Sequence, residues 1–198
     1  MFLKNVESVL SDLGVERKDC HSELAGGHEY RMLKPGGGAV SIEEAMFLVG
    51  CVWVSRPDFV LELGTSQGTS ALVLAAACKD LGKGFVHTVD LAKDAPMTRF
   101  IAQKYELPLN YILDTNSMTY LENFVPNIKQ RHLVFSDTDI PLRPLEVNMV
   151  IDKFPKGTVI VVHDTADAHP FGPMKLAEKV NRPIVELPSP RGISILKV

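Results

Sequence analysis

The chain has 198 residues, of which 45% are hydrophobic and 23% charged, and its formal net charge is −3. This length supports one well-buried core, and the ordinary composition excludes disordered and fibrous classes. Acids and bases are interspersed, without the basic patch that phosphate backbones require, so we expect no nucleic-acid partner. Three scattered cysteines are typical of a reducing compartment. Without a signal-peptide pattern or a membrane-length apolar run, we expect a cytoplasmic protein with no membrane partner.

The first forty residues differ from the rest of the chain. Val6, Val9, Leu10 and Leu13 recur at helical spacing and predict a short amphipathic helix. Residues 16–38 are polar and glycine-rich, which predicts a long loop, and such loops are often functional. We therefore expect two parts: residues 1–40 as a cap or lid, and residues 41–198 as the main domain. The segment 26–38 is the part expected to close over a ligand.

From residue 41 onward, helices and strands alternate. Ser41 with Glu44 forms a capping-box pattern that begins a helix. The predicted strands cover residues 59–63, 85–89, 110–113, 132–136, 158–162, 184–187 and 193–196. The predicted later helices cover residues 69–81, 96–105, 118–124, 142–154 and 171–180. Apolar strands separated by helices predict an α/β fold with a doubly wound, mostly parallel sheet and helices on both faces. Such sheets bind ligands at the carboxyl ends of their strands, where the strand order reverses.

The turn after the first predicted strand contains Gly64 and Gly68, which permit a sharp turn and a close approach of backbone to ligand. A plain strand-to-helix turn would need the same glycines. Asp90, which follows the second strand about twenty residues later, has the spacing of an acid that binds the ribose of an adenosine cofactor. A solvated helix cap is the alternative for Asp90. The two features together favour ribose binding.

The glycine turn also discriminates between adenosine cofactors. Ser66 stands where the dinucleotide pattern G-x-G-x-x-G has a glycine. A dinucleotide needs its pyrophosphate held against bare backbone at a helix start, whereas a cofactor without phosphates does not. The sequence therefore favours S-adenosylmethionine (SAM) over NAD.

Four segments together resemble class I SAM-dependent methyltransferases: 62–70 (ELGTSQGTS), 85–90 (FVHTVD), 132–139 (HLVFSDTD) and 157–165 (GTVIVVHDT). Within that class, the chain is most similar to small O-methyltransferases of the catechol O-methyltransferase and cephalosporin-hydroxylase-like groups. The resemblance runs from about residue 41 to the C-terminus. It implies a Rossmann-like sheet of seven strands, the last one antiparallel.

The resemblance implies roles for individual residues. The cofactor-binding set that it implies is Glu62, Gly64, Thr65, Ser66, Gly68, Ser70, Asp90, Asn116, Ser117 and Asp137. Asn116 and Ser117 fall where such enzymes contact adenine, although either type of side chain also suits a helix N-cap. The catalytic set is Asp137, His163 and Asp164.

Asp137, Asp139 and Asp164 are the predicted metal ligands. They follow neighbouring strands, so their carboxylates should converge, and like charges repel unless they are protonated or neutralised by a cation. Oxygen ligands of this kind suit Mg²⁺ or Ca²⁺. A helix cap and a surface acid are the alternative reading.

Two departures from the family patterns bear on catalysis. The chain has Asp-Thr-Asp-Ile at residues 137–140, where the hydroxylase-like group has Asp-Gly-Asp-His, and it lacks the general-base lysine of the catechol-type enzymes. His163 and His169 remain as candidates for a base or a metal ligand.

The sequence therefore predicts a SAM-dependent O-methyltransferase for a small hydroxylated acceptor, with a divalent metal as an optional component. A non-catalytic binding or assembly protein on the same fold is one alternative, and an NAD-dependent oxidoreductase is another. The oligomeric state, including a homo-oligomer, stays open.

Overall fold

The structure, a computed structural model, describes residues 3–13, 40–92, 95–166, 172–189 and 191–198. The predicted lid segment at residues 26–38 lies outside these residues, as does His169. The division of the chain at residue 40 therefore stays a prediction.

One mixed sheet of seven strands forms the centre of the molecule, in the order β3-β2-β1-β4-β5-β7-β6. The strands are β1 (Phe59–Leu63), β2 (Phe85–Val89), β3 (Leu109–Ile112), β4 (His132–Ser136), β5 (Val159–His163), β6 (Val185–Leu187) and β7 (Ile193–Lys197). Strands β1 to β5 pair in parallel, while β7 is antiparallel to both β5 and β6. The predicted doubly wound, mostly parallel sheet is confirmed, and so is its antiparallel end.

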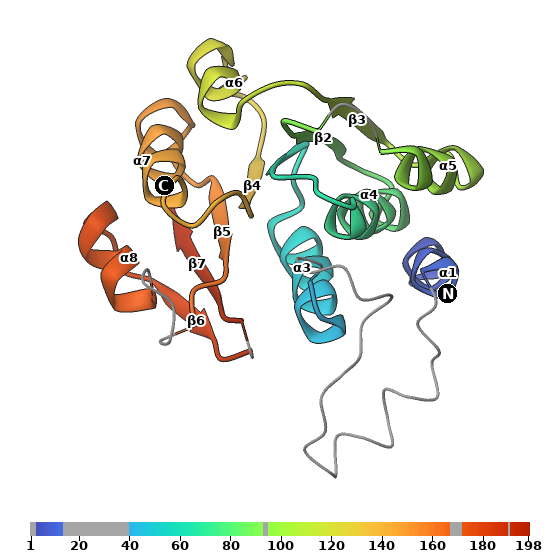
Figure 1. The fold of residues 1–198 in the computed structure, drawn as a ribbon, viewed down its shortest axis with the longest axis horizontal. Helices are drawn as coiled ribbons and strands as arrows, with labels where there is room; N and C mark the ends of the chain where they lie inside the picture. Colours follow the sequence, from blue (N-terminus) through green and yellow to red (C-terminus); the bar gives the residue numbers. More distant parts are fainter. Residues whose placement is uncertain (1–2, 14–39, 93–94, 167–171, 190) are drawn as a thin grey trace, which may run out of the picture.

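Helices cover both faces of this sheet (Figure 1). They are α1 (Lys4–Asp12), α3 (Ile42–Ser55), α4 (Thr69–Leu81), α5 (Pro96–Lys104), α6 (Ser117–Asn123), α7 (Arg143–Lys153) and α8 (Pro173–Val180). Helices α1, α3, α4 and α5 contribute to one hydrophobic core, and α6, α7 and α8 to a second core across the sheet. The predicted bounds of β1, β2, β4 and α4 agree with the structure, and the other elements shift by one or two residues at their ends.

The N-terminal helix α1 belongs to the main core. Val6 and Val9 are fully buried beside the alanine-rich helix α4. The Asp80 carboxylate, near the end of α4, accepts hydrogen bonds at 3.0 Å from the backbone N–H groups of Asn5 and Val6. This arrangement satisfies two N–H groups that the first turn of a helix otherwise leaves unpaired. Helix α1 thus packs against α4 and adds Val6 and Val9 to the core on that face of the sheet.

Helix α3 begins at the capping box that the sequence predicts. The Ser41 hydroxyl accepts from the Glu44 N–H at 3.2 Å, and the Glu44 carboxylate accepts from the Ser41 N–H at 2.6 Å. Glu44 is nevertheless completely buried, which is rare for a carboxylate without further partners. Among the described helices, none combines the length and the apolar character that a membrane crossing requires.

The chain reverses its direction across the sheet between β1 and β4. From β1 it proceeds through β2 to β3 at one edge, and it then returns to β4 and builds outward on the other side. The loops after β1 and β4 therefore diverge and leave a crevice at the carboxyl ends of these strands. The predicted site residues lie at or after the carboxyl ends of strands β1 to β5, so the topology brings them to the edge of the sheet where this crevice lies.

Candidate functional site

The glycine turn after β1 crosses directly over the end of β4. Gly64 has φ +96°, and a Cβ at this position would lie 2.4 Å from the backbone oxygen of Asp137. The loop can therefore make this close approach only with glycine. Gly68 has φ +77° and is the N-cap of α4, where a Cβ would meet the Thr98 side chain at 2.3 Å. Both glycines have the conformational role that the sequence predicts.

Asp90 holds the glycine turn in place. Its carboxylate accepts from the Ser66 N–H and from the Ala92 N–H, each at 2.7 Å. The turn is thereby fixed to the end of β2. A carboxylate has about four acceptor positions, so two hydrogen bonds leave capacity for a ligand hydroxyl.

Glu62 lies behind the turn and is completely buried. The Thr88 hydroxyl donates to its carboxyl group at 2.5 Å, and the Thr65 hydroxyl contacts that of Thr88. Burial raises the pKa of Glu62 to about 8, although hydrogen bonds from Ser70 and Thr88 partly oppose this rise. A protonated Glu62 at neutral pH stabilises the β1–β2 pair without placing a charge in the crevice.

A pocket of about 400 Å³ lies in the crevice. Eight predicted site residues line it: Gly64, Ser66, Asp90, Asn116, Ser117, Asp137, Asp139 and Asp164. The other predicted residues, Glu62, Thr65, Gly68, Ser70 and His163, are not among its lining residues. Its volume falls within the ordinary range for small-molecule sites, roughly 300–1,000 Å³. A larger cavity of about 960 Å³ lies at the amino ends of β4 and β5, but none of the predicted site residues lines it.

Asn116 and Ser117, predicted at the adenine position, have different local roles. The Asn116 side chain caps α6 by accepting from the N–H groups of Met118 and Thr119. The Ser117 hydroxyl donates to Glu146 at 2.5 Å, and Ser136 and Thr138 donate to the same buried carboxylate. Glu146 thus fixes the pocket wall from behind, and Asn116 is the N-cap.

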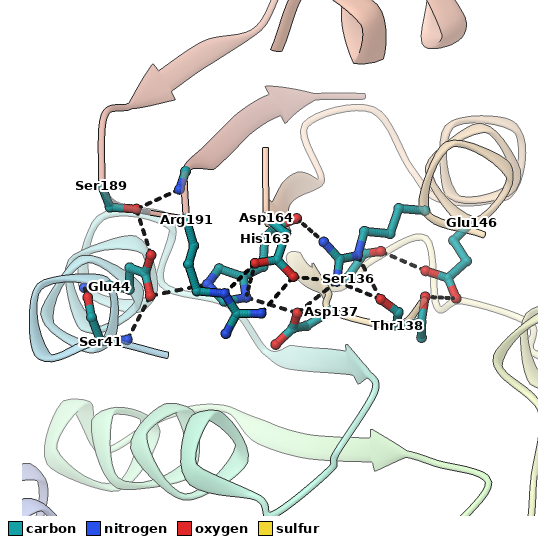
Figure 2. Close-up of polar contacts among 12 residues, drawn as sticks. Ser41, Glu44, Ser136, Asp137, Thr138, Glu146, His163, Asp164, Ser189 and Arg191 are labelled. Atoms are coloured by element: carbon teal, nitrogen blue, oxygen red, sulfur yellow. Dashed lines mark hydrogen bonds and ion pairs between the residues drawn. The ribbon is translucent and has the colours of Figure 1, made fainter. Parts of the chain in front are cut away.

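His163, at the end of β5, lies between two carboxylates (Figure 2). Its Nδ1 is 2.9 Å from Asp137 Oδ1, its Nε2 is 3.1 Å from Glu44 Oε2, and its side chain is fully buried. Burial alone would lower the pKa of His163, but the hydrogen bonds and charges of Asp137 and Glu44 raise it to about 9. For Glu44, burial opposes ionisation, yet its bond to His163 brings its pKa down to about 2. His163 is therefore an imidazolium at neutral pH with both nitrogens occupied, an arrangement suited to positioning and not to accepting a proton.

Arg143, in the first turn of α7, inserts its guanidinium between the ends of β4 and β5. Its Nη2 lies 3.1 Å from Asp137 Oδ1 and 2.9 Å from Asp164 Oδ2. Its Nε donates to the Thr138 carbonyl at 2.8 Å, and its Nη1 donates to the His163 carbonyl. Arg191 forms a two-point ion pair with Asp164 from the turn between β6 and β7, at 2.5 and 2.8 Å (Figure 2).

Asp137, His163 and Asp164 offer ligand atoms within 4.8 Å of one another, which is a metal-site spacing. Asp139 lies outside this group and is exposed on the pocket wall. The donor set does not fit a divalent cation as arranged, because guanidinium or imidazolium groups already contact both carboxylates. The charges of His163, Arg191 and Arg143 outweigh burial and lower the pKa of Asp164. The cation that the converging carboxylates require is thus present as protein side chains.

Sequence reasoning did not identify Glu44, Arg143, Glu146 and Arg191 as site residues. Arg143 carried a detectable signal, since a basic residue in the first turn of a helix opposes the helix dipole and needs compensation by acids. Glu146 lies in the same helix as Arg143, whereas Glu44 and Arg191 come from segments distant in sequence from the residues that they contact, by 119 and 27 residues. Backbone hydrogen bonds from Thr165 and Ala166 to the 191–192 segment bring Arg191 to the end of β5.

The sequence comparison agrees with this geometry. The profile of the methyltransferase domain family matches residues 61–165, which is just over half of the chain and contains the strands that border the pocket. The chain therefore belongs to the methyltransferase domain family. No curated protein sequence matches the chain.

Solved structures confirm the fold at low sequence identity. The O-methyltransferase TomG of Streptomyces achromogenes, solved with SAM, is 17% identical with a TM-score of 0.64, covering 94% of this chain and 87% of TomG. An O-methyltransferase of Bacillus cereus in complex with SAH is 15% identical with a TM-score of 0.65, covering 98% and 90%. The SAH-bound methyltransferase PaMTH1 of Podospora anserina is 14% identical with a TM-score of 0.66, covering 96% and 86%.

Proposed function

We propose that this protein is a SAM-dependent O-methyltransferase that acts on a small hydroxylated acceptor. The observation that carries the proposal is the pocket at the β1/β4 switch point, bordered by Gly64 and by the carboxylate of Asp90. Membership of the methyltransferase domain family supports it, as do O-methyltransferase neighbours solved with SAM or SAH.

The pocket has the polarity that an adenosine sulfonium requires. Asp90, at the end of β2, retains acceptor capacity for the ribose hydroxyls beyond its two backbone bonds. Gly64 lets the loop after β1 pass close to the backbone of Asp137, and this contact shapes the pocket wall where β1 ends. Bound SAM would supply an electrophilic methyl group, so the protein has mainly to align the acceptor oxygen and exclude water.

The hydroxyl group of the methyl acceptor loses its proton during methyl transfer, so the pocket wall needs a base that can take this proton. Asp137 and Asp164 are engaged by cations, and His163 is protonated and buried. Asp139 is exposed on the pocket wall, and its carboxylate makes no side-chain hydrogen bond within the described part of the chain. Asp139, predicted as a metal ligand, is therefore the group that we propose to take the hydroxyl proton while the methyl group moves from sulfur to oxygen.

A binding-only protein on the same fold is the second candidate. The engagement of Asp137, His163 and Asp164 by one another and by arginines favours it, because these were the predicted catalytic residues. An NAD-dependent oxidoreductase has no comparable observation in its favour.

Calorimetric titration with S-adenosylhomocysteine and with NAD tests the cofactor. We expect S-adenosylhomocysteine to bind and NAD to show no heat of binding, and the reverse result would refute the cofactor assignment.

Transfer of a labelled methyl group from SAM to a panel of hydroxylated compounds then tests catalysis. For any acceptor found, Asp139→Asn should lower kcat while leaving cofactor affinity unchanged, and Asp152→Asn serves as a distant control. Cofactor binding without transfer to any compound would favour the binding-only candidate.

A further inference from the structure

Six charged side chains gather at the ends of β4 and β5 and are here called the strand-end ionic cluster: Glu44, Asp137, Arg143, His163, Asp164 and Arg191. All but the partly exposed Arg191 are buried or nearly so, and Figure 2 labels all of them except Arg143. The cluster contains three carboxylates and three groups that carry positive charge when His163 is protonated. The cluster is thus electrically balanced by protein side chains. Buried charges require this kind of pairing, because uncompensated ions in a low-dielectric interior are strongly destabilising.

Arg143 occupies the central position of this cluster. One of its nitrogens, Nη2, contacts a carboxylate oxygen of Asp137 and one of Asp164, so it bridges the two strand ends at 3.1 and 2.9 Å. Its Nε and Nη1 bond to the carbonyl oxygens of Thr138 and His163, and only 6% of its side chain is exposed. A guanidinium presents a rigid, planar set of donors, so these contacts fix its position as well as its charge.

A divalent cation between Asp137 and Asp164 would need the place of Arg143 Nη2. Two further nitrogens of the same guanidinium are held by backbone carbonyls, so its withdrawal would leave buried acceptors and a buried cation without partners. Adding two positive charges to a balanced cluster would also leave an excess of positive charge. Both effects oppose metal binding at this position.

We propose that the guanidinium of Arg143 takes the place of a divalent cation between the ends of β4 and β5, and that this protein works without a metal. The inference rests on the proposed methyltransferase function for its catalytic meaning, but the cluster itself can be tested without turnover. Under this proposal, Arg143 supplies the positive charge that the sequence led us to expect from an optional divalent metal.

The first experiment measures the melting temperature of the EDTA-treated wild-type protein with and without millimolar Mg²⁺, Ca²⁺ or Mn²⁺. A site filled a hundredfold above its Kd would raise the melting temperature by about 5–10 °C. We expect no such rise, and we expect the same affinity for S-adenosylhomocysteine in EDTA and in Mg²⁺. A cation-dependent rise that disappears in the Asp137→Asn, Asp164→Asn double variant would overturn the proposal.

The second experiment removes the guanidinium. Arg143→Met should lower the melting temperature and acquire a stabilising response to Mg²⁺, because two buried carboxylates lose their counter-charge. Arg182→Met, at an exposed arginine, is the matched control and should do neither. Where Arg143→Met is too unstable to measure, adding Asp164→Asn removes one negative charge with the positive one and should restore folding.

Two results of this second experiment would count against the proposal: an Arg143→Met protein as stable as wild type and equally insensitive to Mg²⁺, or a double variant with no recovery. Absence of S-adenosylhomocysteine binding would instead refute the proposed function, while the cation measurements would still decide the role of Arg143.

Discussion

The charged state of His163 predicts a specific loss of stability with rising pH. Its pKa is raised from 6.5 to about 9, because the carboxylates of Glu44 and Asp137 outweigh the effect of burial. A group with a raised folded pKa contributes fully below its unfolded value and loses its contribution as the pH rises through the folded value. The stabilisation should therefore be complete below about pH 6.5 and disappear between there and about pH 9.

The size of the effect follows from the shift. Each pKa unit corresponds to about 1.4 kcal/mol, so the shift of His163 is worth about 3 kcal/mol of unfolding free energy. The groups that face the ring are Glu44, Asp137 and, at 3.9 Å, Asp164. Glu44 contributes in the opposite direction, since its pKa of about 2 means that stability is lost as the pH falls from 4.5 toward 2. The ion pair of His163 with Glu44 therefore contributes most to the free energy of unfolding at about pH 4.5–6.5.

Urea unfolding at half-unit intervals from pH 6 to pH 9 measures this dependence. The comparison is with Glu44→Gln, which removes one of the two carboxylates that hold His163 and should make the pH dependence shallower. Other groups also destabilise the fold as the pH rises, but equally in both proteins. They are the buried carboxyl of Glu62, whose pKa is raised to about 8, and the thiols of half-buried Cys51 and buried Cys78, whose pKa values rise to about 11 and about 12. Titration of the His163 ring by nitrogen-15 NMR gives its pKa directly. Parallel stability curves for the two proteins, or a ring that titrates near 6.5, would refute the reasoning.

Three further substitutions test other parts of the site. Asp90→Asn should weaken S-adenosylhomocysteine binding by about 1.5–3 kcal/mol, the value of a hydrogen bond to a charged group, and unchanged affinity by calorimetry would mean that the ribose lies elsewhere. Gly68→Val should destabilise the fold by at least about 1–2 kcal/mol, because it forces a β-branched residue into a left-handed conformation against Thr98. Urea unfolding checks this, and an unchanged midpoint would contradict it. Glu146→Gln should cost about 1–3 kcal/mol, since one amide oxygen replaces a carboxylate that accepts from three hydroxyls, and the same assay decides.

The sequence by itself determined the fold class and the place of the pocket. Apolar runs of strand length, separated by helical periodicity, sufficed to define strands β1, β2 and β4 and helix α4, because a parallel sheet buried on both faces leaves few other patterns. The roles of Gly64, Gly68 and Asp90 could be predicted from the sequence for a similar reason. Their roles depend on local backbone conformation and on position after a strand, and both are encoded within a few residues.

The tertiary structure decided which groups balance the carboxylates of the site. Asp137 and Asp164 were correctly expected to converge, but the sequence could not show that Arg143 fills the space between them. Nor could it show that Glu44 contacts His163, 119 residues away along the chain, or that Arg191 contacts Asp164, 27 residues away. Charge compensation in a protein interior depends on distance in space and on burial, and neither is visible in residue spacing. For the same reason, the sequence position of His163 was compatible with a role as a base. In the structure, its carboxylate neighbours Glu44 and Asp137 keep it positively charged and hold it in place.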